Sequence, residues 1–111
     1  MNNYLRIKSR GTGKTTDIVS IIKNLLKLNR NILLLTPGIQ CEQALKSIIR
    51  SRNLNFPIAF GTINNLSSTF RGRRFDTIVI DEWDLFSSKD QEMIMIQAHL
   101  NSAIVVMTST V

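Results

Sequence analysis

The sequence is poor in residues that form covalent or metal cross-links. Among its 111 residues it has one cysteine, Cys41, and one histidine, His99. A single cysteine cannot form an internal disulfide, and with one histidine it cannot supply the ligands of a structural zinc site. Such sparing use of cysteine is typical of the reducing cytoplasm, where we expect this protein to be located.

Long apolar runs are also missing, and proline and glycine are scarce. No run approaches the roughly 20 apolar residues that cross a bilayer, and the polar first residues do not fit a signal peptide, so we expect no membrane association. With 2 prolines, 5 glycines and 43% hydrophobic residues, the composition excludes a disordered chain. We therefore expect a single folded domain over residues 1–111.

Acidic residues are outnumbered by basic ones. Eight aspartates and glutamates stand against 14 lysines and arginines, which gives a net charge of +6. This excess favours an acidic partner such as nucleic acid, although nucleotide phosphates alone would also favour some positive charge.

A glycine-containing loop near the N-terminus has the pattern of a phosphate-binding site. It reads Lys8-Ser-Arg-Gly-Thr-Gly-Lys-Thr-Thr16 and lies between an apolar segment and an amphipathic one. Gly11 and Gly13 can take backbone angles that turn amide groups toward one point, and the following helix adds its positive N-terminal end. Lys14 would reach the terminal phosphates of a bound nucleotide, and the hydroxyl of Thr15 would hold Mg²⁺.

The predicted nucleotide contacts extend over the whole loop. They are Ser9, Arg10, Gly11, Thr12, Gly13, Lys14, Thr15 and Thr16. Tyr4 lies close enough in the chain to stack on the base. Lys8 stands where the usual phosphate-loop pattern has its first glycine, and a chance glycine-rich turn is the alternative interpretation.

Two adjacent acidic residues follow an apolar run farther along the chain. The residues from Thr77 to Ile80 are β-branched, which is typical of a strand buried on both faces. Asp81 would support the metal, and Glu82 would polarise the attacking water. By itself the acidic pair could be a solvated turn, but the phosphate-binding pattern upstream favours a nucleotide site.

The other apolar patterns predict alternating strands and helices. The predicted strands are Tyr4–Lys8, Asn31–Thr36, Pro57–Gly61, Thr77–Ile80 and Ala103–Thr108. The predicted helices cover about residues 15–28, Ile39–Arg52 and a segment that starts near Ser88, capped by Ser88 and Gln91. This alternation predicts an α/β fold with a mainly parallel sheet of about five strands, helices on both faces, and the site at the carboxyl ends of the strands.

A few single residues also carry predictions. Met93, Met95 and Met107 have the pattern of core residues. Trp83 is expected to pack against the third helix rather than to touch a ligand, and His99 is expected at the surface.

The nucleotide motifs resemble the RecA-type core of P-loop NTPases, as found in DExD-box helicases and viral terminase large subunits. In the terminase phosphate loop an arginine precedes the Gly-Lys pair by three residues, and Arg10 stands at that place. Asp81-Glu-Trp-Asp84 has the DExD spacing. Met107-Thr-Ser-Thr110 is similar to the coupling motif of both families, with Val111 where terminases have proline.

Two further segments resemble helicase sequences that contact the nucleic-acid backbone. They are Leu35-Thr-Pro-Gly38, and Gly61-Thr62 followed by Leu66. Together with the nucleotide motifs they cover nearly the whole chain.

The resemblance implies hydrolysis of ATP with Mg²⁺. Lys14 and Thr15 would hold phosphates and metal, Asp81 would support the metal, and Glu82 would orient the water. Thr108, Ser109 and Thr110 would sense the γ-phosphate and pass its loss to the nucleic-acid face.

Two charged residues have a family role and a simpler alternative. Arg10 would act as an arginine finger in cis, where a guanidinium stabilises charge on the transferred phosphoryl group. Its alternative is a solvent-exposed loop residue. Asp84 would be a coupling acid of the helicase kind, or else a cap for the next turn.

A basic cluster precedes the acidic pair. Arg71, Arg73 and Arg74 surround Gly72 and would contact nucleic-acid phosphates. A solvated basic loop is the alternative.

The sequence leaves three functions open. The first is a terminase-like ATPase that packages or translocates DNA, which would suggest a viral source and the host cytoplasm. The second is the ATPase part of a DExD-type helicase, and the third is a nucleotide-binding module that does not hydrolyse. Helicases have a second RecA domain and terminases a nuclease domain. We recognise neither here, so we expect a ring of copies, a partner chain that supplies missing modules, or a trimmed remnant.

Overall fold

Parallel strands form the centre of the molecule. The computed structural model describes residues 4–8, 14–51, 58–63, 66 and 75–109; of residues 4–8, 14–17, 41 and 109 it describes the backbone. The strands are β1 (Tyr4–Lys8), β2 (Ile32–Thr36), β3 (Ala59–Thr62), β4 (Thr77–Ile80) and β5 (Ile104–Ser109). They lie in the order β1-β5-β4-β2-β3, and every neighbouring pair is parallel.

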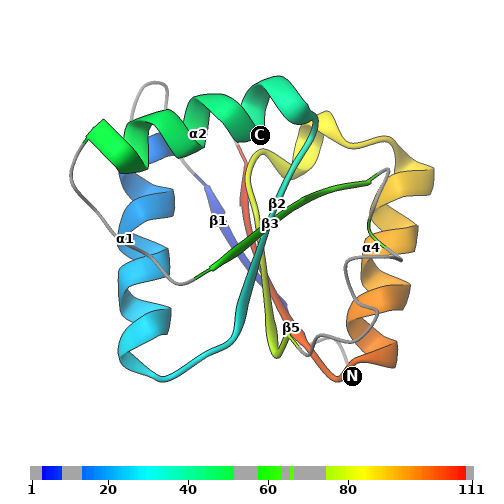
Figure 1. Ribbon diagram of the computed structural model, residues 1–111. Coiled ribbons are helices and arrows are strands. Elements are labelled where there is room, and N and C mark those ends of the chain that lie inside the picture. Colours follow the sequence, from blue (N-terminus) through cyan, green and yellow to red (C-terminus); the bar gives the residue numbers. More distant parts are fainter. Residues whose placement is uncertain (1–3, 9–13, 52–57, 64–65, 67–74, 110–111) are drawn as a thin grey trace.

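Helices cover both faces of this sheet (Figure 1). Helices α1 (Lys14–Lys27) and α2 (Ile39–Ser51) lie on one face, and α4 (Ser88–Leu100) lies on the other. A short 3₁₀ helix, η3 (Trp83–Leu85), connects β4 to α4. The predicted α/β fold with a parallel sheet between helices is therefore confirmed.

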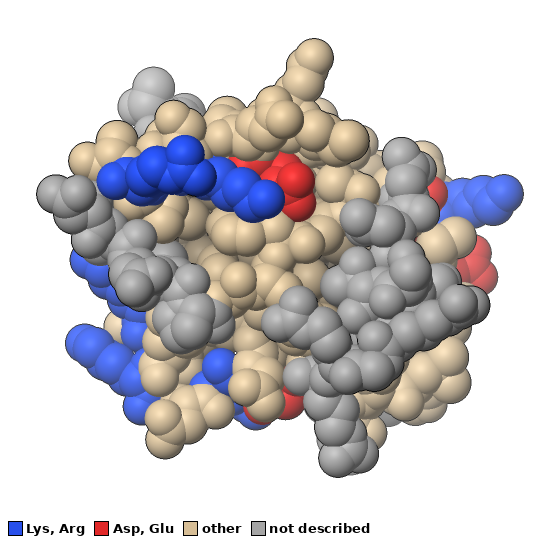
Figure 2. Space-filling view, viewed as in Figure 1, with Lys and Arg blue, Asp and Glu red and all other residues tan. Residues whose placement is uncertain are grey.

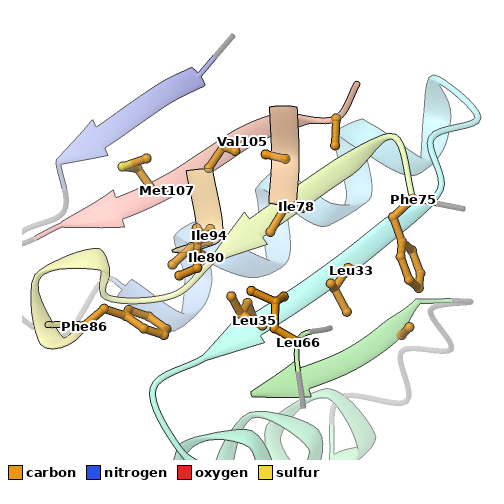
Figure 3. Packing of buried hydrophobic residues seen from close by; sticks show 13 residues of the cluster. Leu33, Leu35, Leu66, Phe75, Ile78, Ile80, Phe86, Ile94, Val105 and Met107 are labelled. Atoms are coloured by element: carbon orange, nitrogen blue, oxygen red, sulfur yellow. The ribbon is translucent and has the colours of Figure 1, made fainter. Parts of the chain in front are cut away.

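Alternate residues of the central strands point to opposite faces and form two cores. Under α4 the core contains Leu33, Leu35, Ile78, Ile80, Ile94 and Ala98, of which Figure 3 shows the packing. Under α1 and α2 it contains Ile18, Ile22, Leu34, Leu45, Ile49 and Val79. Strands covered on both sides must be apolar throughout, and each fully buried Leu or Ile contributes about 1.5–3 kcal/mol. This explains the unbroken apolar runs of β2 and β4.

Asp76 joins the strands at the amino edge of the sheet. Its Oδ1 accepts hydrogen bonds from the backbone N–H of Asn31 (3.0 Å) and from the hydroxyl of Thr77 (2.9 Å). Arg30 Nη1 lies 3.9 Å from the same oxygen. The backbone carbonyl of Asp76 accepts from Ile104 N–H at 2.9 Å. One residue therefore holds the starts of β2, β4 and β5 together.

Two sequence predictions about α4 are wrong in detail. The N-cap is Ser87, not Ser88, and its hydroxyl accepts from the N–H of Asp90 at 3.1 Å. Both serines have a suitable partner three residues later, so the capping pattern alone could not choose between them. Met93 is exposed rather than buried, whereas Met107 is buried and Met95 packs at the margin of the core. His99 is exposed, as predicted.

The other element boundaries are close to those predicted. Strand β3 begins at Ala59 and extends through Thr62. Pro57 and Arg52, which were expected to begin that strand and to end α2, lie outside the described residues.

Candidate functional site

The strand register brings the separate sequence motifs to one edge of the sheet. Lys8 at the end of β1 pairs with Ser109, Met107 pairs with Ile80, and Ile80 pairs with Leu35. Because the strands are parallel, their carboxyl ends all lie at this edge. Since β5 alone separates β1 from β4, the loop after β1 leaves the sheet about 10 Å from the end of β4.

Helix α1 starts at the same edge. Its first residue is Lys14, which belongs to the predicted phosphate-binding sequence, and from there the helix runs along the sheet toward the opposite edge (Figure 1). A helix N-terminus carries unpaired N–H groups and partial positive charge, which favour an anion. The backbone therefore places this N-terminus and the acidic pair at the same carboxyl edge.

The acidic pair continues directly from β4. The N–H of Asp81 still donates to the carbonyl of Leu35 at 3.1 Å, so this residue prolongs the pairing with β2. Glu82 then leaves the strand with φ 57° and ψ 62°, in the left-handed region. A side chain in this region costs roughly 1–2 kcal/mol, so surrounding contacts must hold the residue there. Both acidic residues are partly buried.

Thr108 joins β5 to this acidic pair. Its hydroxyl donates to Asp81 Oδ1 at 3.4 Å and accepts the backbone N–H of Glu82 at 3.1 Å. Its side chain is buried, and buried hydroxyl groups are normally hydrogen-bonded in this way. The coupling residue predicted from the sequence thus contacts the predicted metal-supporting residue.

The short helix η3 fixes the backbone after Glu82. The carbonyl of Glu82 accepts from Leu85 N–H at 2.9 Å, and that of Trp83 accepts from Phe86 N–H at 3.1 Å. The side-chain amide of Gln91 donates to the same Trp83 carbonyl at 3.0 Å. Gln91 therefore binds this turn instead of capping its own helix. This role could not be predicted from the sequence, because the only signal at Gln91 was the capping spacing.

The aromatic side chains of this segment pack on the core under α4. The rings of Trp83 and Phe86 lie 6.5 Å apart between centroids, and Phe86 is buried. Figure 3 shows Phe86 pointing from the segment after β4 toward Ile80 and Leu35. Trp83 is partly buried against the core that contains Ile94 of α4.

Asp84 lies inside η3 and is exposed. The N-cap of the following helix α4 is Ser87, so Asp84 does not occupy that position. The helicase-type coupling role for Asp84 stays a prediction.

The carboxylates of this edge suit magnesium better than a softer metal. In the described part of the chain, no group of three or more His, Cys, Asp or Glu side chains could hold a metal ion. Magnesium does not need such a cage, because it usually takes one or two protein oxygens and completes its shell with phosphate and water. Asp81, with the hydroxyl of Thr15 as predicted partner, would provide a donor set of that kind.

Several predicted site residues fall outside what the structure describes. Residues Ser9, Arg10, Gly11, Thr12, Gly13, Arg71, Arg73, Arg74 and Thr110 are outside the described ranges. The side chains of Tyr4, Lys14, Thr15, Thr16 and Ser109 are outside them as well. Their proposed contacts therefore stay predictions.

Some basic side chains on the described surface interact with neighbouring residues of the same chain. Figure 2 shows a blue band over α2 with a red group at its right-hand end. Lys46 Nζ lies 3.7 Å from Glu42 Oε2 and 4.9 Å from the centre of the Phe60 ring. This lysine is therefore a weak candidate for a nucleic-acid contact.

Comparisons with known proteins do not assign a family. No known protein-family model matches the chain, and no curated protein sequence is significantly similar to it. Within the described residues, every helix is too short or too polar to span a bilayer.

Proposed function

We propose that this protein is a magnesium-dependent ATPase with a RecA-like core, of the type that drives nucleic-acid motors. The observation that carries the proposal is the pair of hydrogen bonds between Thr108 and the acidic pair. A motor ATPase must connect the loss of the γ-phosphate to a mechanical element. A buried threonine on β5 that contacts both Asp81 and Glu82 provides a physical route for that connection.

The sheet order also supports a phosphate site between two motifs. The loop that ends at Lys14 and the carboxylates that follow β4 leave the same edge, on either side of β5. A bound triphosphate could therefore extend from the start of α1 to Asp81. Both a helix N-terminus and a hard-oxygen metal site favour phosphate at such a place.

Each residue then has a defined task in the reaction. Lys14 would pair with the β- and γ-phosphates, and Thr15 and Asp81 would hold Mg²⁺, which would supply positive charge to the phosphate oxygens. Glu82 orients a water molecule and accepts its proton while the water oxygen bonds to the γ-phosphorus and the bridge to the β-phosphate breaks. Arg10 stabilises charge on the equatorial oxygens of the transferred group.

The proposed partner is nucleic acid, with DNA packaging or translocation by a terminase-like motor as the leading process. The arginine of the phosphate loop supports this process, as does the excess of basic residues. We further propose that the protein acts as a homo-oligomer or together with a partner chain.

A helicase-type ATPase is the second candidate, and one observation favours it. Thr36 and Thr62 are register partners at the carboxyl ends of β2 and β3, and both are buried. The hydroxyl of Thr36 donates to the carbonyl of Gly38 at 3.2 Å. The two segments that resemble helicase contacts with the nucleic-acid backbone therefore lie side by side at the same edge as the acidic pair.

ATP turnover with different polymers tests these proposals. We would measure single-turnover hydrolysis with Mg²⁺, with and without duplex DNA, tailed duplex and single-stranded RNA, at two salt concentrations. Stimulation by duplex DNA that weakens at high salt supports the terminase-like motor, and unwinding of the tailed duplex supports the helicase. Tight binding of Mg-ATP without turnover would leave a nucleotide-binding module and reject the enzyme.

A further inference from the structure

The turn after the acidic pair is held from two sides. On one side the hydroxyl of Thr108 accepts the N–H of Glu82 at 3.1 Å. On the other side the amide of Gln91 donates to the carbonyl of Trp83 at 3.0 Å. The backbone that carries the Glu82 side chain therefore lies between two fixed points, one on β5 and one on α4.

Glu82 depends on these hydrogen bonds more than the other described residues with a positive φ do. Among the described non-glycine residues, three have a positive φ: Asn29, Glu82 and Ser102. Asn29 and Ser102 lie just after α1 and α4, where a left-handed residue often ends a helix. Glu82 instead lies between a strand and a 3₁₀ helix, so its conformation depends on local hydrogen bonds.

Helix α4 is a suitable anchor for this turn. Ile94 and Ala98 are buried against the sheet, and Ser87 caps the first turn of the helix. The N–H of Gln91 donates to the carbonyl of Ser87 at 2.8 Å, so the backbone of Gln91 is itself fixed. Its side-chain amide then reaches back to a residue that directly follows Glu82.

We propose that Gln91 is a positioning residue for the Glu82 carboxylate. By holding the Trp83 carbonyl it keeps Glu82 in its left-handed conformation and aims the carboxylate at the water that attacks the γ-phosphate. This inference rests on the proposed ATP hydrolysis and adds to it a residue that touches neither nucleotide nor metal. Misaligned catalytic groups lower the rate of the chemical step more than the affinity for substrate.

Two substitutions separate positioning from folding. Gln91→Met keeps the length of the side chain and removes the donor. Gln91→Glu keeps the shape, and at about pH 8 its ionised carboxylate accepts hydrogen bonds only. A negative charge in the first turn favours the helix, which offsets part of the stability lost with this hydrogen bond. Gln97→Met, farther along the same helix, is the matched control.

For both Gln91 variants we expect kcat for ATP to fall about ten- to a hundredfold, because the catalytic carboxylate loses its alignment. KM for ATP should stay within about twofold of the wild type, since the phosphate loop is untouched. Trp83 is the single tryptophan, so its fluorescence would report the altered turn directly. Gln97→Met should leave kcat and fluorescence unchanged.

Three results would overturn the inference. One is a wild-type kcat in a folded Gln91→Glu variant, and another is a rise in KM with kcat unchanged. The third is a kcat that falls only in proportion to the folded fraction measured by circular dichroism. If the wild type itself binds Mg-ATP without turnover, the proposed function fails and the positioning role falls with it. Wild-type turnover with fully active Gln91 variants would reject the positioning role alone.

Discussion

Thr108 Oγ1 lies 3.4 Å from Asp81 Oδ1, although the two residues are 27 positions apart in the chain. Thr108 Oγ1 also accepts a hydrogen bond from the backbone N–H of Glu82. One buried hydroxyl thus connects strand β5 to both residues of the acidic pair. Under the proposed function, loss of the γ-phosphate would move Asp81 or Glu82, and the hydrogen bonds to Thr108 would transmit this movement to β5.

This contact makes Thr108 the sharpest test of the coupling route. Thr108→Val has nearly the same shape but no hydroxyl, so the N–H of Glu82 loses its acceptor. We expect kcat to fall at least about tenfold and the free energy of unfolding to fall by about 1–3 kcal/mol, with ATP affinity little changed. Thr108→Ser keeps the hydroxyl and should retain most of the rate. Equal kcat values for Thr108→Val and the wild type would contradict the coupling role.

Lys14 tests the phosphate site independently of the chemistry. Lys14→Ala removes a charge-assisted interaction of about 1.5–3 kcal/mol, which corresponds to a roughly 10- to 150-fold loss of ATP affinity. Titration calorimetry with Mg-ATP measures it directly. Lys23→Ala, an exposed lysine later in α1, is the matched control and should bind as the wild type does. Unchanged affinity in Lys14→Ala would remove the phosphate site from the proposal.

Asp76 offers a prediction about stability that does not depend on function. Asp76→Ala leaves the N–H of Asn31 and the buried hydroxyl of Thr77 without their acceptor. We expect a loss of about 1–3 kcal/mol in the free energy of unfolding, measured by urea denaturation. Asp76→Asn keeps an acceptor oxygen and should lose less. Glu92→Ala at an exposed position of α4 is the control. If Asp76→Ala lost no more stability than this control, Asp76 would not join the strands as described.

Much of the fold could be predicted because buried parallel strands leave a plain sequence pattern. The unbroken apolar runs of β2 and β4 identified both strands, and the position of Asp81 and Glu82 directly after β4 placed them at the carboxyl edge. Parallel strands bring carboxyl ends together, so the sequence was enough to predict that the two proposed nucleotide-binding motifs leave the same edge.

The finer geometry of the site had no comparable signal. The left-handed conformation of Glu82 occurs without the glycine or asparagine that usually marks it. The hydrogen bond from Gln91 to Trp83 could not be inferred, because Gln91 also fitted a capping pattern. Exposure of Met93 was missed for a different reason: helical spacing shows which residues share a face, but not whether another element covers that face.

The arginines that precede β4 are predicted to contact nucleic-acid phosphates, and this contact can be tested by mutation. Replacing Arg71, Arg73 and Arg74 together by alanine should leave ATP turnover without polymer unchanged and abolish its stimulation by DNA. Each lost phosphate contact should make the negative slope of log affinity against log salt shallower by about 0.9. Lys23, Lys27 and Lys89, replaced together, remove the same charge from exposed positions of α1 and α4 and are the matched control. An equal loss of stimulation in both triple variants would indicate a response to net charge instead of a contact at the arginines.

Glu82 separates binding from hydrolysis. Glu82→Gln keeps the shape and the backbone hydrogen bond to Thr108, but the amide cannot accept the proton of the attacking water. We expect kcat to fall by roughly a hundredfold or more, while Mg-ATP affinity stays close to that of the wild type. Single-turnover hydrolysis measures the chemical step, and calorimetry measures the affinity. Glu92→Gln, at an exposed position of α4, is the control for loss of an acidic charge. A Glu82→Gln variant that hydrolyses ATP as fast as the wild type would show that another group activates the water. The proposed role of Gln91 in positioning the Glu82 carboxylate would then be rejected as well.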